Sequence, residues 1–182
     1  MPERPTLPTD RLVLRPLIAA DAPRVRDLAA DDAIASMIPH LPHPYELDHA
    51  QTWIGGHAAA FDEGTTLELG IHAGEKDGLV GAVALHLEPS HERADLGYWI
   101  GTPFRGRGYA GEAAGAMLRY GFGTLGLHRI HAHHLTRNPA SGRVLRGIGM
   151  TPEGVFREHI LHRGRYEDVA FYAILRSESP TA

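Results

Sequence analysis

Residues 93–124, RADLGYWIGTPFRGRGYAGEAAGAMLRYGFGT, carry the strongest fold signal in the chain. Residues 93–101 predict a strand, and residues 108–124 predict a helix with one apolar face. A glycine-rich turn joins the two. A strand that enters a helix through such a turn forms an anion site, because unpaired backbone N–H groups and the positive end of the helix dipole meet there.

The turn, residues 105–110, has the residue types of a phosphate site. Gly106 and Gly108 let the backbone approach phosphate oxygens without a Cβ in the way, and Arg105 and Arg107 can add charge-assisted hydrogen bonds. Seven arginines and four histidines lie between residues 105 and 146, with Glu112 as the single acidic residue. This basic region favours a small polyanion as ligand; a solvated basic surface and a tight turn without a ligand are the alternatives.

Two other nucleotide-binding motifs do not fit the turn. Gly106-x-Gly108-x-x-Gly111 matches the dinucleotide fingerprint, but that motif needs an acidic residue about 20 positions later to bind the ribose. Residues 113–152 contain no Asp or Glu. A phosphate loop is excluded as well, because no Gly-Lys-Ser/Thr follows the glycines. A nucleotide-dependent oxidoreductase is therefore disfavoured.

The rest of the chain predicts a single α/β domain with a mixed sheet of about seven strands flanked by helices. The chain has 182 residues and no segment that reads as a linker. We expect the domain to cover residues 1–176 and a loose tail to follow at 177–182. The predicted strands are residues 11–17, 67–73, 79–88, 93–101, 128–135, 153–161 and 166–175, and the longer predicted helices are residues 46–61, 108–124 and 139–147.

Composition excludes several classes of function. The sequence has no cysteine, which rules out disulfides, thiolate metal sites and cysteine nucleophiles. No stretch reaches the roughly 20 apolar residues of a membrane helix, and the N-terminus lacks the apolar core of a signal peptide. A cytoplasmic protein is expected. The net charge of −4 argues against nucleic-acid binding. The histidines at 128, 131, 133 and 134 have no carboxylate near them in sequence, so no metal is expected.

Arg105-x-x-Gly108-x-Ala110 resembles the Gln/Arg-x-x-Gly-x-Gly/Ala signature of the GNAT superfamily of N-acetyltransferases. Other segments resemble in particular the RimJ/RimL type, which modifies the N-termini of ribosomal proteins. In chain order these segments are residues 9–15, 94–101, 109–113, 127–130, 138–141, 146–150 and 153–157. The resemblance implies a splayed sheet with acetyl-CoA in the gap between the strands at 93–101 and 128–135.

The resemblance also implies which residues hold acetyl-CoA as cosubstrate. Backbone groups of residues 99–101 are expected to pair with the pantetheine arm like a further strand, and N–H groups of residues 107–111 to hold the pyrophosphate. Asn138 is expected to bond the pantetheine, and Ser141 to act as general acid for the departing thiolate. The implied cofactor-binding residues are Trp99, Ile100, Gly101, Arg105, Gly106, Arg107, Gly108, Tyr109, Ala110, Gly111, Asn138, Ser141, Arg143 and Arg146, the last two at the 3′-phosphate end.

The implied reaction is transfer of an acetyl group to a primary amine by direct attack in a ternary complex. Asp95 is the first choice of general base, acting directly or through water, because similar sequences often carry Glu there. Glu68, Glu92 and Glu158 are weaker candidates, and one histidine of the cluster could relay a proton. The acceptor is either a protein N-terminal α-amine or a small amine. A regulatory domain that binds acyl-CoA without turnover is the alternative, and both monomer and homodimer remain open.

Overall fold

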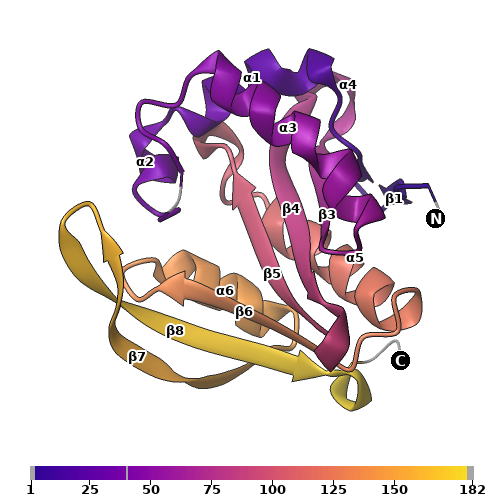
Figure 1. Ribbon diagram of the computed structural model, residues 1–182, viewed down its shortest axis with the longest axis vertical. Coiled ribbons are helices and arrows are strands. Elements are labelled where there is room, and N and C mark those ends of the chain that lie inside the picture. The colour runs from indigo at the N-terminus through magenta and orange to yellow at the C-terminus, as the bar shows by residue number, and fades with distance from the viewer. Residues whose placement is uncertain (1–2, 40, 180–182) are drawn as a thin grey trace.

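The computed structural model describes residues 3–39 and 41–179, which form one mixed sheet flanked by helices. The sheet has eight strands in the order β1-β2-β3-β4-β5-β6-β8-β7. The strands are β1 (Leu7–Pro8), β2 (Val13–Arg15), β3 (Thr66–His72), β4 (Leu79–Glu88), β5 (Arg93–Ile100), β6 (Arg129–Leu135), β7 (Thr151–His162) and β8 (Arg165–Leu175). Figure 1 shows β3–β5 and β6–β8 spreading apart from a common corner.

The strand count exceeds the predicted seven because the chain has an additional edge strand. Leu7 and Pro8 pair with Leu14 and Val13, and a two-residue strand is too short to produce a periodic pattern. Residues 74–77, between β3 and β4, form one helical turn. Residues 176–178, where the predicted domain passes into the predicted tail, form a 3₁₀ turn, and residues 180–182 of that tail lie outside the described residues.

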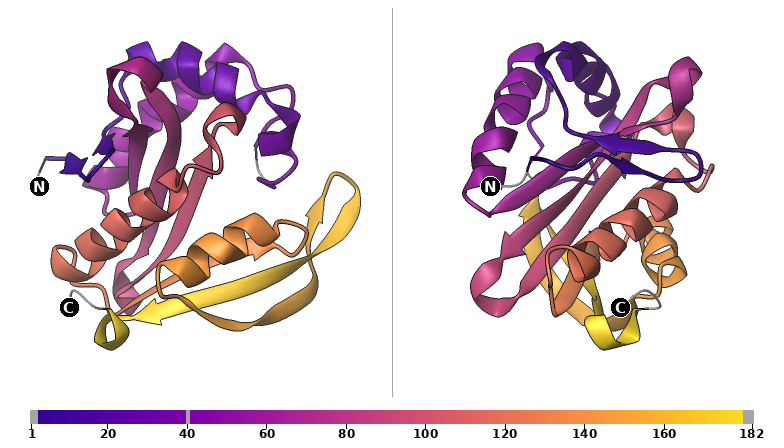
Figure 2. Two further views of the ribbon diagram at one scale, coloured as in Figure 1. Left: turned by 180° about the vertical axis from the view of Figure 1, so that it is seen from behind. Right: turned by 90° about the vertical axis from the view of Figure 1, so that its right-hand side faces the viewer.

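The helices are α1 (Ala22–Ala29), α2 (Asp32–Ala35), α3 (Leu47–Asp62), α4 (Gly74–Asp77), α5 (Tyr109–Gly123) and α6 (Pro139–Gly147). The two views in Figure 2 show α5 and α6 on one face of the sheet and α1 and α3 on the other. No helix in the described part of the chain is both long and apolar enough to cross a membrane.

Strand alternation distributes the residues of β5 between these two faces. Ala94 and Leu96 are buried in the main core with Met117 and Phe122 of α5. Trp99 packs against a second apolar cluster, formed by α1, α3 and their neighbours. Asp95 therefore lies on the α1–α3 face, whereas the core side of β5 faces α5.

The gap in the sheet arises from the short pairing between β5 and β6. These parallel strands pair at only three positions, the last being Asp95 with His131. Beyond this point β5 continues along β4 and β6 continues along β8. The two half-sheets therefore diverge, and no strand of the described residues pairs there with the edge of β5 that faces the gap.

Candidate active site

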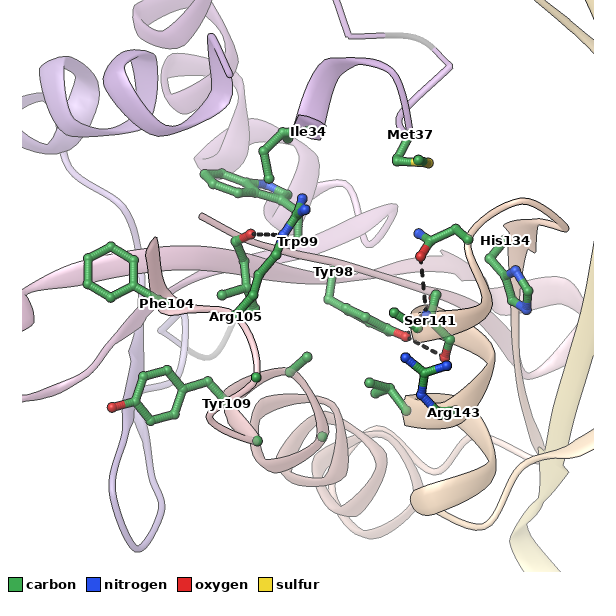
Figure 3. A pocket seen from close by; sticks show the side chains of 18 of the residues that line it. Ile34, Met37, Tyr98, Trp99, Phe104, Arg105, Tyr109, His134, Ser141 and Arg143 are labelled. Carbon is green, nitrogen blue, oxygen red and sulfur yellow. Dashed lines mark hydrogen bonds between the residues drawn. The ribbon is translucent and has the colours of Figure 1, made fainter. Parts of the chain in front are cut away.

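A pocket of about 560 Å³ opens where β5 and β6 diverge. This volume lies in the usual range of small-molecule sites, roughly 300–1,000 Å³. Its lining comes from both faces of the sheet: Tyr98 and Ser141 belong to the α5–α6 side, and Trp99 and Met37 to the other side. Figure 3 shows Ile34 and Met37 across the pocket from Ser141 and Arg143. The pocket therefore runs through the sheet.

The glycine-rich turn forms one end of the pocket. Gly106 and Gly108 have φ values of 75° and 81°, a left-handed conformation that favours glycine. Gly108 is the N-cap of α5, and a Cβ added at Gly106 would meet no atom within 4 Å. Among the described contacts, the backbone N–H groups of residues 107–111 donate no hydrogen bond. These free donors at a helix N-terminus suit an anion.

The side chains of two arginines in this turn bond to the protein itself. Arg105 lines the pocket, but its guanidinium donates to the carbonyl oxygens of Ile100 (3.3 Å) and Ala33 (3.1 Å). Arg107 forms an ion pair of 3.0 Å with Asp77 and does not line the pocket. The turn thus presents mainly backbone to a ligand, while its arginines hold neighbouring segments in place.

The two arginines of α6 differ in position. Arg143 lines the pocket. Arg146 donates a hydrogen bond of 2.7 Å to the hydroxyl of Tyr172 and stacks over that ring, outside the lining. Of the residues predicted to bind the cofactor, Gly101, Arg107 and Arg146 are those that the pocket lining does not include.

A pair of hydroxyl groups faces the pocket on the α6 side. The hydroxyls of Tyr98 and Ser141 lie 2.8 Å apart, and Figure 3 shows this bond inside the pocket. Burial raises the pKa of Tyr98 to about 12. Asn138 caps α6, because its side-chain oxygen accepts a bond from the N–H of Ser141 at 3.4 Å. Tyr98 was not predicted as a site residue. It is three residues after Asp95 on the same predicted strand, so strand alternation could have placed it on the opposite face, beside the segment that holds Ser141.

Asp95 does not line the pocket. Its Oδ2 lies 3.3 Å from Nδ1 of His133, which does. Burial by itself would raise the pKa of Asp95, but its interactions with His133 and then with His131 and His86 outweigh this and lower it. The hydrogen bond with Asp95 raises the pKa of His133 against the opposing effect of burial. Asp95, the predicted general base, is therefore connected to the pocket only by its contact with His133.

A set of polar contacts joins the β6–β8 half-sheet to α2 and its C-terminal end across the opening. Arg137, after β6, donates to the carbonyl oxygen of Ser36 at 2.6 Å and forms a 3.0 Å ion pair with Glu167. At the tip of the β7–β8 hairpin, Arg163 contacts Asp32 of α2 at 2.7 Å. Figure 1 shows this hairpin extending toward the α2 side. We call these contacts the strap; they hold the segment around Met37 at the rim of the pocket.

The described residues contain no group of three or more His, Asp or Glu side chains placed to hold a metal ion. The histidines of β6 are divided between the two faces of the sheet. His131 and His133 share one face, where the His133 ring stacks on Phe171, and on the other face the His134 ring stacks on Tyr172. They therefore do not converge on one point.

Comparison with known proteins agrees with this geometry. Residues 11–151 match the acetyltransferase (GNAT) domain. The uncharacterized N-acetyltransferase YoaA of Bacillus subtilis is 32% identical over 173 residues, covering 94% of this chain and 97% of that protein. The ribosomal protein uS5-alanine N-acetyltransferase of Escherichia coli is 28% identical over 179 residues, covering 92% and 89%. RimJ of Mycobacterium smegmatis, solved in complex with CoA-disulfide, has the same fold, with a TM-score of 0.87, 24% identity and coverage of 98% and 90%. The chain therefore belongs to the GNAT family of N-acetyltransferases.

Proposed function

We propose that this enzyme transfers an acetyl group from acetyl-CoA to a primary amine, by direct attack of the amine in a ternary complex. The observation that carries the proposal is a pocket that passes through the gap between β5 and β6. One end has a cradle of free backbone N–H groups suited to phosphate. The other end opens on the opposite face, where an acceptor can approach.

The donor side of the pocket fits acetyl-CoA as substrate. Backbone groups of Trp99, Ile100 and Gly101 follow the unpaired edge of β5 and would pair with the pantetheine arm. The N–H groups of residues 107–111 would hold the pyrophosphate, and Arg143 is the arginine of α6 that lines this pocket. The CoA compound in the solved RimJ structure supports this use of the fold.

The Tyr98–Ser141 pair would stabilise the departing thiolate. Because its pKa is about 12, Tyr98 stays protonated at neutral pH and acts as a hydrogen-bond donor. An ordinary thiol has a pKa near 8.5, so the sulfur can leave as thiolate once a donor faces it. For Ser141 we therefore propose a hydrogen-bonding role shared with Tyr98. A backbone N–H near the end of β5 would face the developing oxyanion.

The acceptor that we propose first is the α-amine of a polypeptide N-terminus, with small primary amines as the second class. The relative named as a uS5-alanine acetyltransferase supports the first class. The chemistry agrees, because an α-amine has a pKa near 8 and loses its proton far more easily than a lysine amine near 10.4. A site without a strong base can therefore handle it.

A thiol-release assay with a panel of peptide N-termini and small amines tests the proposal. We expect acceptor-dependent release of CoA and a mass increase of one acetyl group on the acceptor. The alternative is a domain that binds acyl-CoA without turnover. Binding of acetyl-CoA by calorimetry, together with no release for any acceptor, would favour that alternative.

The donor site can be tested separately with Gly111→Glu. Gly111 lies in the first turn of α5 with ordinary φ, and the nearest atom to an added Cβ is 4.0 Å away. The new carboxylate suits a helix N-terminus but repels phosphate. We expect acetyl-CoA affinity to fall at least tenfold, whereas Gly55→Glu on the exposed side of α3 leaves it unchanged. Retained affinity in Gly111→Glu would refute this placement of the pyrophosphate.

A further inference from the structure

The Asp95–His133 pair lies at the point where the two half-sheets separate. Asp95 forms the last β5–β6 pair with His131. His133 is two residues further along β6 and therefore projects from the same face. The carboxylate of Asp95 reaches across the beginning of the gap to Nδ1 of His133, at 3.3 Å. The pair thus stands at the narrow end of the pocket.

The imidazole of His133 is held in place and has one free nitrogen. Its ring stacks on Phe171 of β8, with 5.5 Å between ring centres and 27° between planes. Within the described structure Asp95 is its one polar partner, at Nδ1. The side chain is 37% exposed and lines the pocket. Nε2 is therefore available to a group that enters the pocket.

The sheet separates this histidine from the hydroxyl pair. His133 is on the α1–α3 face of the sheet, and Tyr98 and Ser141 are on the α5–α6 face. An amine adds to the thioester carbon from one face of the planar carbonyl group, so the base that takes its proton need not lie beside the donors that face the sulfur. The free Nε2 is on the side open to the acceptor.

We infer that His133 is the general base of the acetyl transfer proposed above, with Asp95 as a positioning residue that holds the ring and its Nδ1 proton. In this step the amine lone pair forms the C–N bond at the thioester carbon. The C–S bond breaks with its electron pair going to sulfur, and the proton lost by the amine nitrogen goes to Nε2. The imidazolium then returns that proton to solvent.

The charges around the pair distinguish His133 from its neighbours. Asp95 contributes the carboxylate from β5, His131 lies on the same strand, and His86 faces Asp95 from β4. On the β7 side, His159 packs on Phe171. Burial lowers the pKa of His131, whereas Asp95 raises that of His133. Of the two β6 histidines on this face, His133 is therefore the one suited to accept a proton.

Imidazole titration by NMR tests the pair without any acceptor. His133→Gln identifies the His133 resonance in the spectrum of the full-length protein. We expect its pKa to lie above the ordinary 6.5 in the wild-type protein and to fall in Asp95→Asn. An unchanged His133 pKa in Asp95→Asn would refute the positioning role.

The pH dependence of kcat tests the catalytic role. General-base catalysis contributes about 100- to 10,000-fold, so we expect His133→Gln to lower kcat by that factor and to remove the acidic limb of its pH profile. The KM for acetyl-CoA should stay within twofold. In Asp95→Asn the acidic limb of the kcat profile should move to lower pH and kcat should fall. Asp95→Glu should restore part of that lost kcat. An acidic limb that shifts with the acceptor's own amine pKa would belong to the amine instead.

His131→Gln is the matched control, because His131 shares the strand and face of His133 but does not line the pocket. It should retain both kcat and the acidic limb. Wild-type turnover together with an unaltered His133→Gln profile would overturn this inference alone. Absence of turnover by the wild-type enzyme with every acceptor would overturn the proposed function as well.

Discussion

Glu68→Gln should stabilise the protein at neutral and alkaline pH. Glu68 lies on β3, opposite Ala84 of β4, and is only 8% exposed. Its carboxylate has no hydrogen bond or ion pair with any described residue, and burial raises its pKa from 4.5 to about 8. The folded protein therefore keeps a proton on Glu68 at pH values where the unfolded chain has lost it.

The sign and size of the effect follow from linkage between folding and proton binding. The folded pKa is raised, so the stability contributed by Glu68 is fully present below about pH 4.5 and is lost progressively up to about pH 8. Each pKa unit corresponds to about 1.4 kcal/mol. The cost at pH 7 is therefore roughly 3 kcal/mol, and it approaches 5 kcal/mol above pH 8. Glutamine keeps the shape without the charge and removes this cost.

Urea unfolding of the wild type and of Glu68→Gln at pH 5, 6, 7 and 8 measures the difference directly. At pH 5 the variant should be more stable by only about 1 kcal/mol, because pH 5 lies just above the ordinary pKa of 4.5. The variant should become more stable by roughly 3 kcal/mol at pH 7, equivalent to roughly 6–12 °C in Tm for a chain of this size. Glu63→Gln, at the exposed end of α3, is the control and should show no such trend. A difference that does not grow with pH would refute the reasoning.

Three further changes test other parts of the site. Arg137→Met removes the bond to Ser36 and should raise the acceptor KM severalfold without altering the KM for acetyl-CoA; steady-state kinetics that show both unchanged would contradict a role for the strap. Tyr98→Phe removes the hydroxyl beside Ser141 and should lower kcat about 10- to 100-fold, because the loss of one transition-state donor costs up to about 1,000-fold. Single-turnover rates measure this effect. An unchanged rate would exclude Tyr98 from thiolate stabilisation. Asn138→Ala removes the cap of α6 and should cost about 1 kcal/mol of stability, measured by urea unfolding, with Asn138→Asp retaining most of it; equal losses in both would exclude the cap as the cause.

Local interactions explain why the sequence was sufficient for the donor end of the site. The strand, turn and helix of residues 93–124 are contiguous, so periodicity and glycine placement predict them without knowledge of the rest of the chain. The positive φ values at Gly106 and Gly108 are local backbone properties. The predicted strands at 93–101 and 128–135 are also the two that diverge, as the resemblance to the family implied.

Side-chain partners between distant segments were beyond such reasoning. Composition suggested that Arg105 and Arg107 would contact phosphate, yet the fold gives them the carbonyl of Ala33 and the carboxylate of Asp77. A charged side chain bonds to whichever partner the fold brings near, and strand periodicity does not tell which partner that is.

The acceptor side of the site shows most clearly which features follow from the sequence and which follow from the tertiary structure. The sequence by itself determined that Asp95 and His133 stand on predicted strands, that a basic glycine-rich turn lies between them, and that no cysteine is present. Only the parallel register of β5 and β6 decided that Asp95 meets His133 and reaches the pocket through it. Likewise, only the tertiary structure joins Arg137 to Ser36 across the opening. These contacts link residues dozens to a hundred positions apart, and they depend on register and strand divergence, which arise from packing of the whole sheet.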